Sequence, residues 1–257
     1  MKLRAIGTGS KFCKHPLIPS SFIVSSDDKL TLIGAPLATT AALEKYGYKV
    51  EDISVITFLS PQSDQTIGLI ELAHIFRNKK KKPILAAPAR LLSVMRDRIE
   101  TELGFFLTES FDVKSALKIH IKEEFYTEII TFVPSFINPS IPSYSLRFET
   151  SKIFLTGETS LNEDWLFKEV GNDLILHSCK SSDRSGGQSP LVSEIQELPM
   201  YLQSKMWLYG YDIASKDIEQ PFPMMYLPPG SWVFDSERKD KLLNKDRFIR
   251  ENSRKQT

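Results

Sequence analysis

The chain has 257 residues and a formal net charge of +1, with 41% hydrophobic and 25% charged residues, which allows one large domain or two small ones. It has no run of eighteen apolar residues and no apolar signal core at its N-terminus, so we expect neither a membrane span nor secretion and predict a cytoplasmic protein. Cys13 and Cys179 could form one disulfide, but they fit two buried thiols of a reducing compartment better.

The N-terminal part of the chain alternates short strand patterns with one helical pattern. Residues 2–8 form a weakly alternating strand that ends in the turn Gly7-Thr8-Gly9-Ser10. The β-rich runs at 21–24 and 29–33 flank a polar turn, which is typical of a hairpin. The apolar spacing over residues 37–46 predicts a helix.

The stretch from residue 53 to residue 69 organises the rest of the chain. Its apolar start at 53–56 predicts a buried strand, the polar turn that follows carries Asp64, and residues 67–69 open a helix. This order of strand, polar loop and helix start places polar side chains at the end of a buried strand. The stretch is therefore the first candidate for a functional site.

A basic run, Arg77-Asn78-Lys79-Lys80-Lys81-Lys82, follows the next helical pattern. We interpret it as a solvated turn whose cations favour the helix C-terminus. The alternative is an anion-attracting patch. Because no aromatic residues are interleaved with these cations, nucleic-acid binding is not favoured.

The remaining chain continues to alternate strands and helices. Residues 220–230 are rich in proline and apolar residues, so they cannot form a helix or a central strand. They are either a coil strapped over the core or a partner-binding surface. The charged residues after Asp235 predict a short helix that frays into disorder. Strand patterns are found at 83–87, 117–122, 126–132, 152–156, 173–179 and 205–211, and helical patterns at 89–103 and 192–203.

The loop after residue 56 resembles the metallo-β-lactamase signature Thr-His-x-His-x-Asp-His-x-x-Gly. In that family the histidines and the aspartate bind two metals and position the attacking water. Here Phe58, Ser60 and Gln65 stand in the three histidine slots, and only Asp64 survives. The residues Pro61-Gln62 look like an insertion.

Other segments resemble the ribonuclease Z branch of this superfamily and the phage cyclic-nucleotide phosphodiesterases, which are anti-Pycsar-like proteins. In the pattern Asp-His-x-x-Pro-Ser-aromatic-Gly, Asn138 holds the aspartate slot and Pro139 the histidine slot. Gly157-Glu158-Thr159 resembles the Gly-Asp-Thr whose aspartate bridges the metals. Gly210 replaces the final metal histidine of the last strand.

The resemblance implies a four-layer αβ/βα sandwich, the metallo-β-lactamase fold. We expect a single domain over residues 1–235 and a charged C-terminal tail over 236–257. It also implies a homodimer, for which the apolar segment 222–227 could provide a surface. The compartment would be the host cytoplasm if the chain is phage-encoded.

The lost ligands predict that the chain has no dinuclear zinc site, no cofactor and no catalytic residue. The alternative for the metal is a weakly bound Mg²⁺ or Ca²⁺ held by oxygen atoms of Asp64, Glu158 and Asn138. We therefore expect a catalytically inactive protein, not an enzyme, whose cleft has a binding or regulatory role toward a nucleotide-like ligand or a protein partner. The alternative is a metal-dependent phosphodiesterase that acts on cyclic nucleotides or RNA. Amides and a hydroxyl could bond a polar ligand while an aromatic ring stacks on a base, and the candidates are Phe58, Ser60, Gln62, Gln65 and Asn138.

Overall fold

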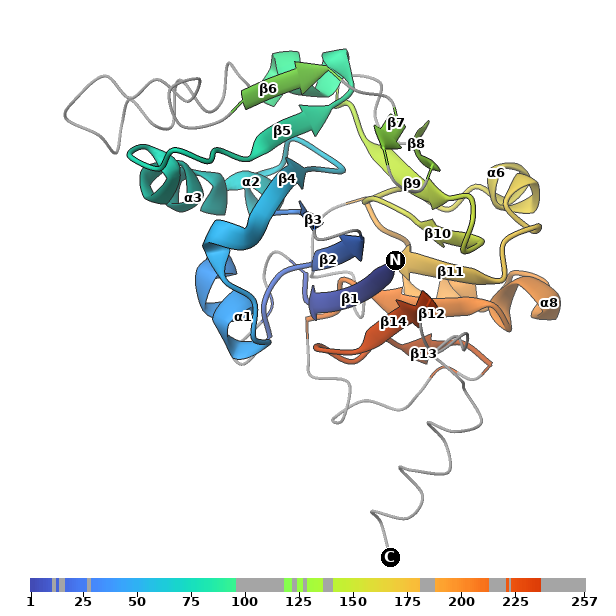
Figure 1. Cartoon of the computed structure of the whole chain (residues 1–257). Helices are drawn as coiled ribbons and strands as arrows, with labels where there is room; N and C mark the ends of the chain where they lie inside the picture. Colours follow the sequence, from blue (N-terminus) through green and yellow to red (C-terminus); the bar gives the residue numbers. More distant parts are fainter. Residues whose placement is uncertain are drawn as a thin grey trace, which may run out of the picture.

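Two β-sheets of seven strands each form the centre of the molecule. In the computed structural model they lie face to face, with helices on both outer sides (Figure 1). The structure describes residues 1–10, 13, 17–26, 29–95, 118–121, 124–126, 129–135, 141–180, 188–212, 221 and 223–236.

The first sheet has the order β14-β1-β2-β3-β4-β5-β6. Strands β14 to β3 pair antiparallel and β3 to β6 pair parallel. The predicted hairpin is confirmed, because β2 and β3 are antiparallel neighbours. The strands are β1 (Lys2–Gly7), β2 (Ser21–Ser26), β3 (Lys29–Ile33), β4 (Ile53–Thr57), β5 (Ile84–Ala87), β6 (Lys118–Ile121) and β14 (Trp232–Asp235).

The second sheet has the order β13-β12-β11-β10-β9-β8-β7. Strands β7 to β10 pair antiparallel and β10 to β13 pair parallel. Each sheet therefore has one parallel half, and the carboxyl ends of its parallel strands share an edge. The strands are β7 (Glu124–Tyr126), β8 (Ile129–Pro134), β9 (Tyr144–Phe148), β10 (Ile153–Leu155), β11 (Leu174–Ser178), β12 (Met206–Tyr209) and β13 (Met225–Tyr226).

The helices are short and lie outside the sheets. Asn162 begins α6 because its side chain accepts a hydrogen bond from the Trp165 N–H at 2.9 Å. The helix predicted over 192–203 is two helices, since Pro199 has no N–H to continue the first one. The helices are α1 (Thr39–Lys45), η1 (Val50–Asp52), α2 (Ser63–Thr66), α3 (Gly68–Phe76), α6 (Glu163–Lys168), α7 (Val192–Ile195) and α8 (Met200–Gln203), and residues 89–95 are also helical.

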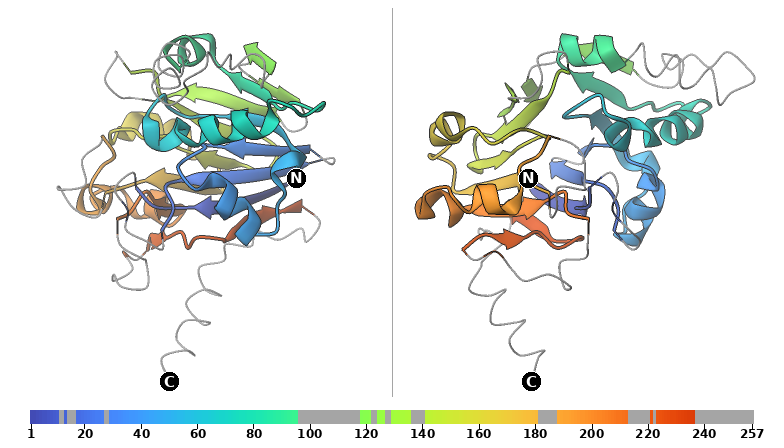
Figure 2. Two further views of the ribbon diagram at one scale, coloured as in Figure 1. Left: turned by 90° about the vertical axis from the view of Figure 1, so that its left-hand side faces the viewer. Right: turned by 180° about the vertical axis from the view of Figure 1, so that it is seen from behind.

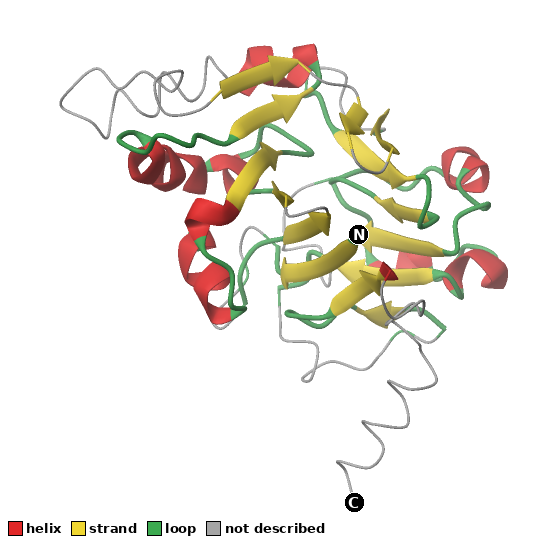
Figure 3. Cartoon of the chain, in the orientation of Figure 1, coloured by secondary structure: helices red, strands yellow, loops and turns green. Residues whose placement is uncertain are grey.

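Three apolar clusters separate the four layers. The middle cluster lies between the sheets and includes Phe22 and Trp207. The other two join each sheet to its own helices, with Phe76 in one and Trp165 in the other. Helices and strands separate into outer and inner layers in all three views (Figures 1 to 3). The predicted αβ/βα sandwich is confirmed.

The segment around residue 225 differs from one of the two sequence-based interpretations. Met224, Met225, Tyr226 and Leu227 are at most 4% exposed, and β13 is an edge strand of the second sheet. The described part of the segment is thus a strap that completes the core, and it offers no apolar surface to a second copy. The homodimer stays a prediction.

The end of the described chain differs from the prediction that the strand at 205–211 is the last. Strands β13 and β14 follow it, and β14 returns to the first sheet beside β1. The predicted charged tail lies outside the described residues from residue 237 onward. Among the helices that the structure describes, none is long and apolar enough to cross a bilayer.

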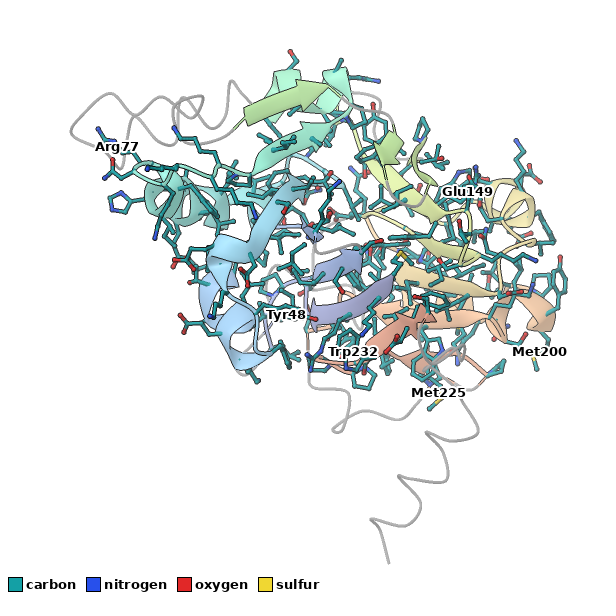
Figure 4. The ribbon with its side chains drawn as sticks, in the orientation of Figure 1. Tyr48, Arg77, Glu149, Met200, Met225 and Trp232 are labelled. Atoms are coloured by element: carbon teal, nitrogen blue, oxygen red, sulfur yellow. The ribbon has the colours of Figure 1, made fainter. Side chains whose placement is uncertain are left out.

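Arg4 holds the returning strand β14 in place. Its guanidinium lies 4.7 Å from the ring centroid of Tyr46 and 4.8 Å from that of Trp232. It also donates hydrogen bonds to the carbonyl oxygens of Gly230 and Tyr46, at 3.0 and 3.1 Å. Figure 4 shows Tyr48 and Trp232 beside the same part of the first sheet. These contacts tie the end of α1 and the start of β14 to β1.

Candidate functional site

A cleft lies where the carboxyl ends of parallel strands from both sheets meet. Parallel strands end at the same edge of a sheet, so the residues after them gather there. The loop after β1 closes one side of the cleft with Gly9 and Ser10. The strand-end residues that line the cleft are Leu59 and Ser60 after β4, Gly157 and Glu158 after β10, Ser178 at the end of β11 and Tyr209 at the end of β12.

Backbone hydrogen bonds join the two halves of the molecule around the cleft. The Tyr144 N–H donates to the Leu59 carbonyl at 2.7 Å. The Gly210 N–H donates to the Thr8 carbonyl, also at 2.7 Å. These bonds cross from one sheet to the other, so they fix the distance between the two walls.

The cleft is small and carries charges of both signs. Its volume is about 60 Å³, and one water needs roughly 10–15 Å³, so it admits a few waters or one phosphate-sized group. The charged residues that line it are Asp64, Glu158 and Lys180. A whole nucleotide would have to place its base outside.

Asp64 and Gln65 reach the cleft from α2, the short helix after β4. The Gln65 side-chain amide donates to the Ser20 carbonyl at 3.2 Å. Its backbone carbonyl accepts from the Ala35 N–H at 2.7 Å. Gln65 therefore joins α2 to the segments on either side of the hairpin, which is a structural task.

Glu158 is held at both ends. One oxygen of its carboxylate accepts from the Gln188 N–H at 2.7 Å, and its backbone carbonyl accepts from the Ser143 hydroxyl at 2.9 Å. The carboxylate thereby links the β10 loop to the segment around Ser189, which also lines the cleft.

The other residues singled out from the sequence are divided between the cleft and the core. Ser60 lines the cleft, although it is only 1% exposed, and its hydroxyl accepts from the Gln62 N–H at 3.4 Å. Gln62 is partly buried and does not line the cleft. Phe58 is fully buried in the core between the first sheet and its helices, so it cannot stack on a ligand there. Asn138 and Pro139 lie outside the described residues.

Gly210 lines the cleft in the slot of the final metal histidine. Its φ is +87°, and a Cβ there would lie 3.1 Å from the Cys179 carbonyl oxygen. This left-handed conformation favours glycine, so the local backbone explains the residue.

Sequence reasoning missed several cleft residues. Lys180 follows a predicted strand directly, and the basic side chain at that strand end was the available signal. The Ser189 hydroxyl donates to the Ser178 hydroxyl at 3.0 Å, and the Ser178 hydroxyl donates to the Gly157 carbonyl at 2.9 Å. Their proximity depends on a tertiary contact that no local pattern records.

The residues present do not fit a zinc pair. Zinc prefers histidine nitrogen and cysteine sulfur in tetrahedral sites, and the described lining contains no histidine. Cys179 is its sole sulfur donor, and burial raises the pKa of that thiol well above its usual range. Among the described residues no three His, Cys, Asp or Glu side chains gather as a possible metal site.

His177 lies beside the cleft but is turned into the core. It is fully buried, and its Nδ1 is 2.7 Å from the Ser178 carbonyl oxygen. Burial lowers the pKa of His177 from 6.5 to about 4. On acidification the unfolded chain takes up a proton on this imidazole at a higher pH than the folded chain does. The free energy of unfolding should therefore fall as pH drops from 6.5 toward 4.

We expect His177→Gln to remove part of the acid sensitivity of the fold. When the pH is lowered from 7.5 to 5, His177 should reduce the free energy of unfolding of the wild type by about 2 kcal/mol. The variant lacks the imidazole and should not show this reduction. Urea unfolding at both pH values measures this difference. The same substitution at the exposed His74 is the control and should leave the pH dependence unchanged. Equal pH dependence in wild type and His177→Gln would contradict the prediction.

Known proteins resemble this chain in sequence pattern and in fold. Residues 1–227 match a family model described as Anti-Pycsar protein Apyc1. A diphosphatase of the PhnP family is 13% identical with a TM-score of 0.71, covering 91% of this chain and 97% of that one. The short form of human tRNase Z is 14% identical with a TM-score of 0.61, covering 91% and 99%. No curated protein sequence matches.

A metallo-β-lactamase fold protein from Bacillus subtilis is also similar, at 15% identity and a TM-score of 0.62, covering 82% of this chain and 86% of that one. At these identities the solved structures show the fold alone. Together with the family match, they confirm the predicted resemblance to the ribonuclease Z and phosphodiesterase branch of the metallo-β-lactamase superfamily.

Proposed function

The chain belongs to the Anti-Pycsar protein Apyc1 family, and from that premise we propose that it is a phosphodiesterase that hydrolyses cyclic nucleotides. The prediction that the chain is not an enzyme is wrong, because the family match, with the diphosphatase and the tRNase Z among its neighbours, points to a hydrolytic enzyme. The loss of the metal-binding residues from these motifs does not by itself exclude hydrolysis. A family's local motifs can change while its cleft remains.

One observation carries the proposal: two carboxylates, Asp64 and Glu158, line the same phosphate-sized cleft as Lys180. The lysine can attract the phosphate charge, and a carboxylate can accept a proton from water. The family match supports a cyclic nucleotide as the substrate. Its phosphodiester would enter the cleft, and its base would stay at the mouth.

The reaction adds water across one phosphorus–oxygen bond of the cyclic phosphodiester. The water oxygen bonds to phosphorus, the ring ester bond breaks, and the ribose oxygen leaves with a proton. We assign to Asp64 the proton that the attacking water loses. Glu158 is tied to Gln188 through one oxygen, so it also holds the neighbouring cleft wall in place.

The test is hydrolysis of a panel of cyclic nucleotides by the purified chain. Phosphorus NMR should record conversion of the cyclic diester signal to a monoester signal, at a rate proportional to the protein concentration. The double variant Asp64→Asn, Glu158→Gln serves as the control for contaminating enzymes. A panel left intact under every added divalent cation would sink the proposal.

A further inference from the structure

The cleft lies where the fold family implies a pair of metals, yet three of its polar side chains bond to other parts of the chain. The Gln65 side-chain amide donates to the Ser20 carbonyl at 3.2 Å. One carboxylate oxygen of Glu158 accepts from the Gln188 N–H at 2.7 Å. Ser178 donates to the Gly157 carbonyl at 2.9 Å. Each bond directs a side chain toward the protein, whereas a metal site needs lone pairs that converge on one point.

The bonds also do the structural work that a metal pair would do. Contacts between Tyr144 and Leu59 and between Gly210 and Thr8, each 2.7 Å long, join the two halves across the cleft. A site whose walls are already held by backbone hydrogen bonds does not need an ion to bring them together.

Two of the former histidine slots disfavour histidine for separate physical reasons. Phe58 is fully buried in an apolar core, where an imidazole would lose its hydration. Gly210 has a φ of +87°, which a histidine adopts only at a cost.

We infer that this cleft is a hydrogen-bonded site that has replaced the zinc pair of its fold, and that it neither recruits zinc nor requires it to stay formed. The inference deepens the proposed function and rests on it only where it concerns turnover. Cyclic-nucleotide hydrolysis by this chain should therefore continue after zinc is removed.

Zinc content and thermal stability test the inference without substrate. The full chain is stripped with a chelator, incubated with excess Zn²⁺, desalted and measured by mass spectrometry for metals. We expect zinc far below one equivalent per chain and an unfolding midpoint that zinc does not raise. Zinc that persists in both Asp64→Asn and Glu158→Gln lies elsewhere and agrees with the inference.

Stoichiometric zinc that either carboxylate variant abolishes would overturn the inference. The outcomes separate it from the proposed function. A chain that hydrolyses cyclic nucleotides only with a bound zinc pair would keep the phosphodiesterase and lose the hydrogen-bonded site. A chain without zinc and without turnover would lose only the phosphodiesterase.

Discussion

Replacing Asp64 with Asn is expected to lower kcat for cyclic-nucleotide hydrolysis by about 100- to 10,000-fold, the usual contribution of a positioned general base. The variant keeps the size of the side chain but cannot accept the proton that the attacking water loses. KM should change little, because the amide still fills its place in the cleft wall. Steady-state kinetics on the best substrate of the panel measures both constants.

The matched control is Asp52→Asn, the same substitution at an exposed residue of η1. It should leave kcat and KM at wild-type values. Circular dichroism and the unfolding midpoint establish that both variants are folded. If Asp64→Asn kept the wild-type kcat, Asp64 would not be the base, and the role assigned to it would be wrong.

Phe58→Ala is expected to reduce the free energy of unfolding by about 3–5 kcal/mol, the usual cost of deleting a buried aromatic ring. Phe58 is fully buried and packs in the core between the first sheet and its helices. The substitution leaves a cavity in that core. Urea unfolding followed by fluorescence measures the loss.

Phe167→Ala is the control for this second prediction. Its ring is 39% exposed on α6, so the same deletion leaves no closed cavity and should cost less than about 1 kcal/mol. A loss in Phe58→Ala as small as that expected for Phe167→Ala would contradict the assignment of Phe58 to the core. It would reopen the interpretation of Phe58 as a ligand-stacking ring.

The strands and helices could be predicted because their signals are local, and the sandwich was implied by the resemblance to the metallo-β-lactamase superfamily. In runs such as 21–24 and 53–56 the apolar residues follow the pattern of a buried strand. The geometry of a single strand sets this pattern. Element ends were less accurate. The helix predicted over 192–203 is two helices separated at Pro199. The chain continues into β13 and β14 after the strand at 205–211, which was predicted to be the last.

The candidate site could be predicted only in part. Asp64, Glu158 and Gly210 do line the cleft, and it was the resemblance to the metal-binding motifs that singled them out. Phe58 does not, because alternation along the chain turns it to the helical side of the sheet. Lys180 and Ser189 were missed, since their place in the cleft depends on how β11 and the segment after it fold back.

The sequence by itself determined the order of the elements and the absence of histidine from the expected ligand slots, because periodicity and residue identity are properties of the chain. The layers of the sandwich were implied by the resemblance to the metallo-β-lactamase superfamily. Only the tertiary structure decided what the remaining polar side chains do. Gln65 bonds to Ser20, and Glu158 to Gln188. The partners in these two pairs are 45 and 30 residues apart in the chain, and only the packing of two sheets brings them within hydrogen-bond distance.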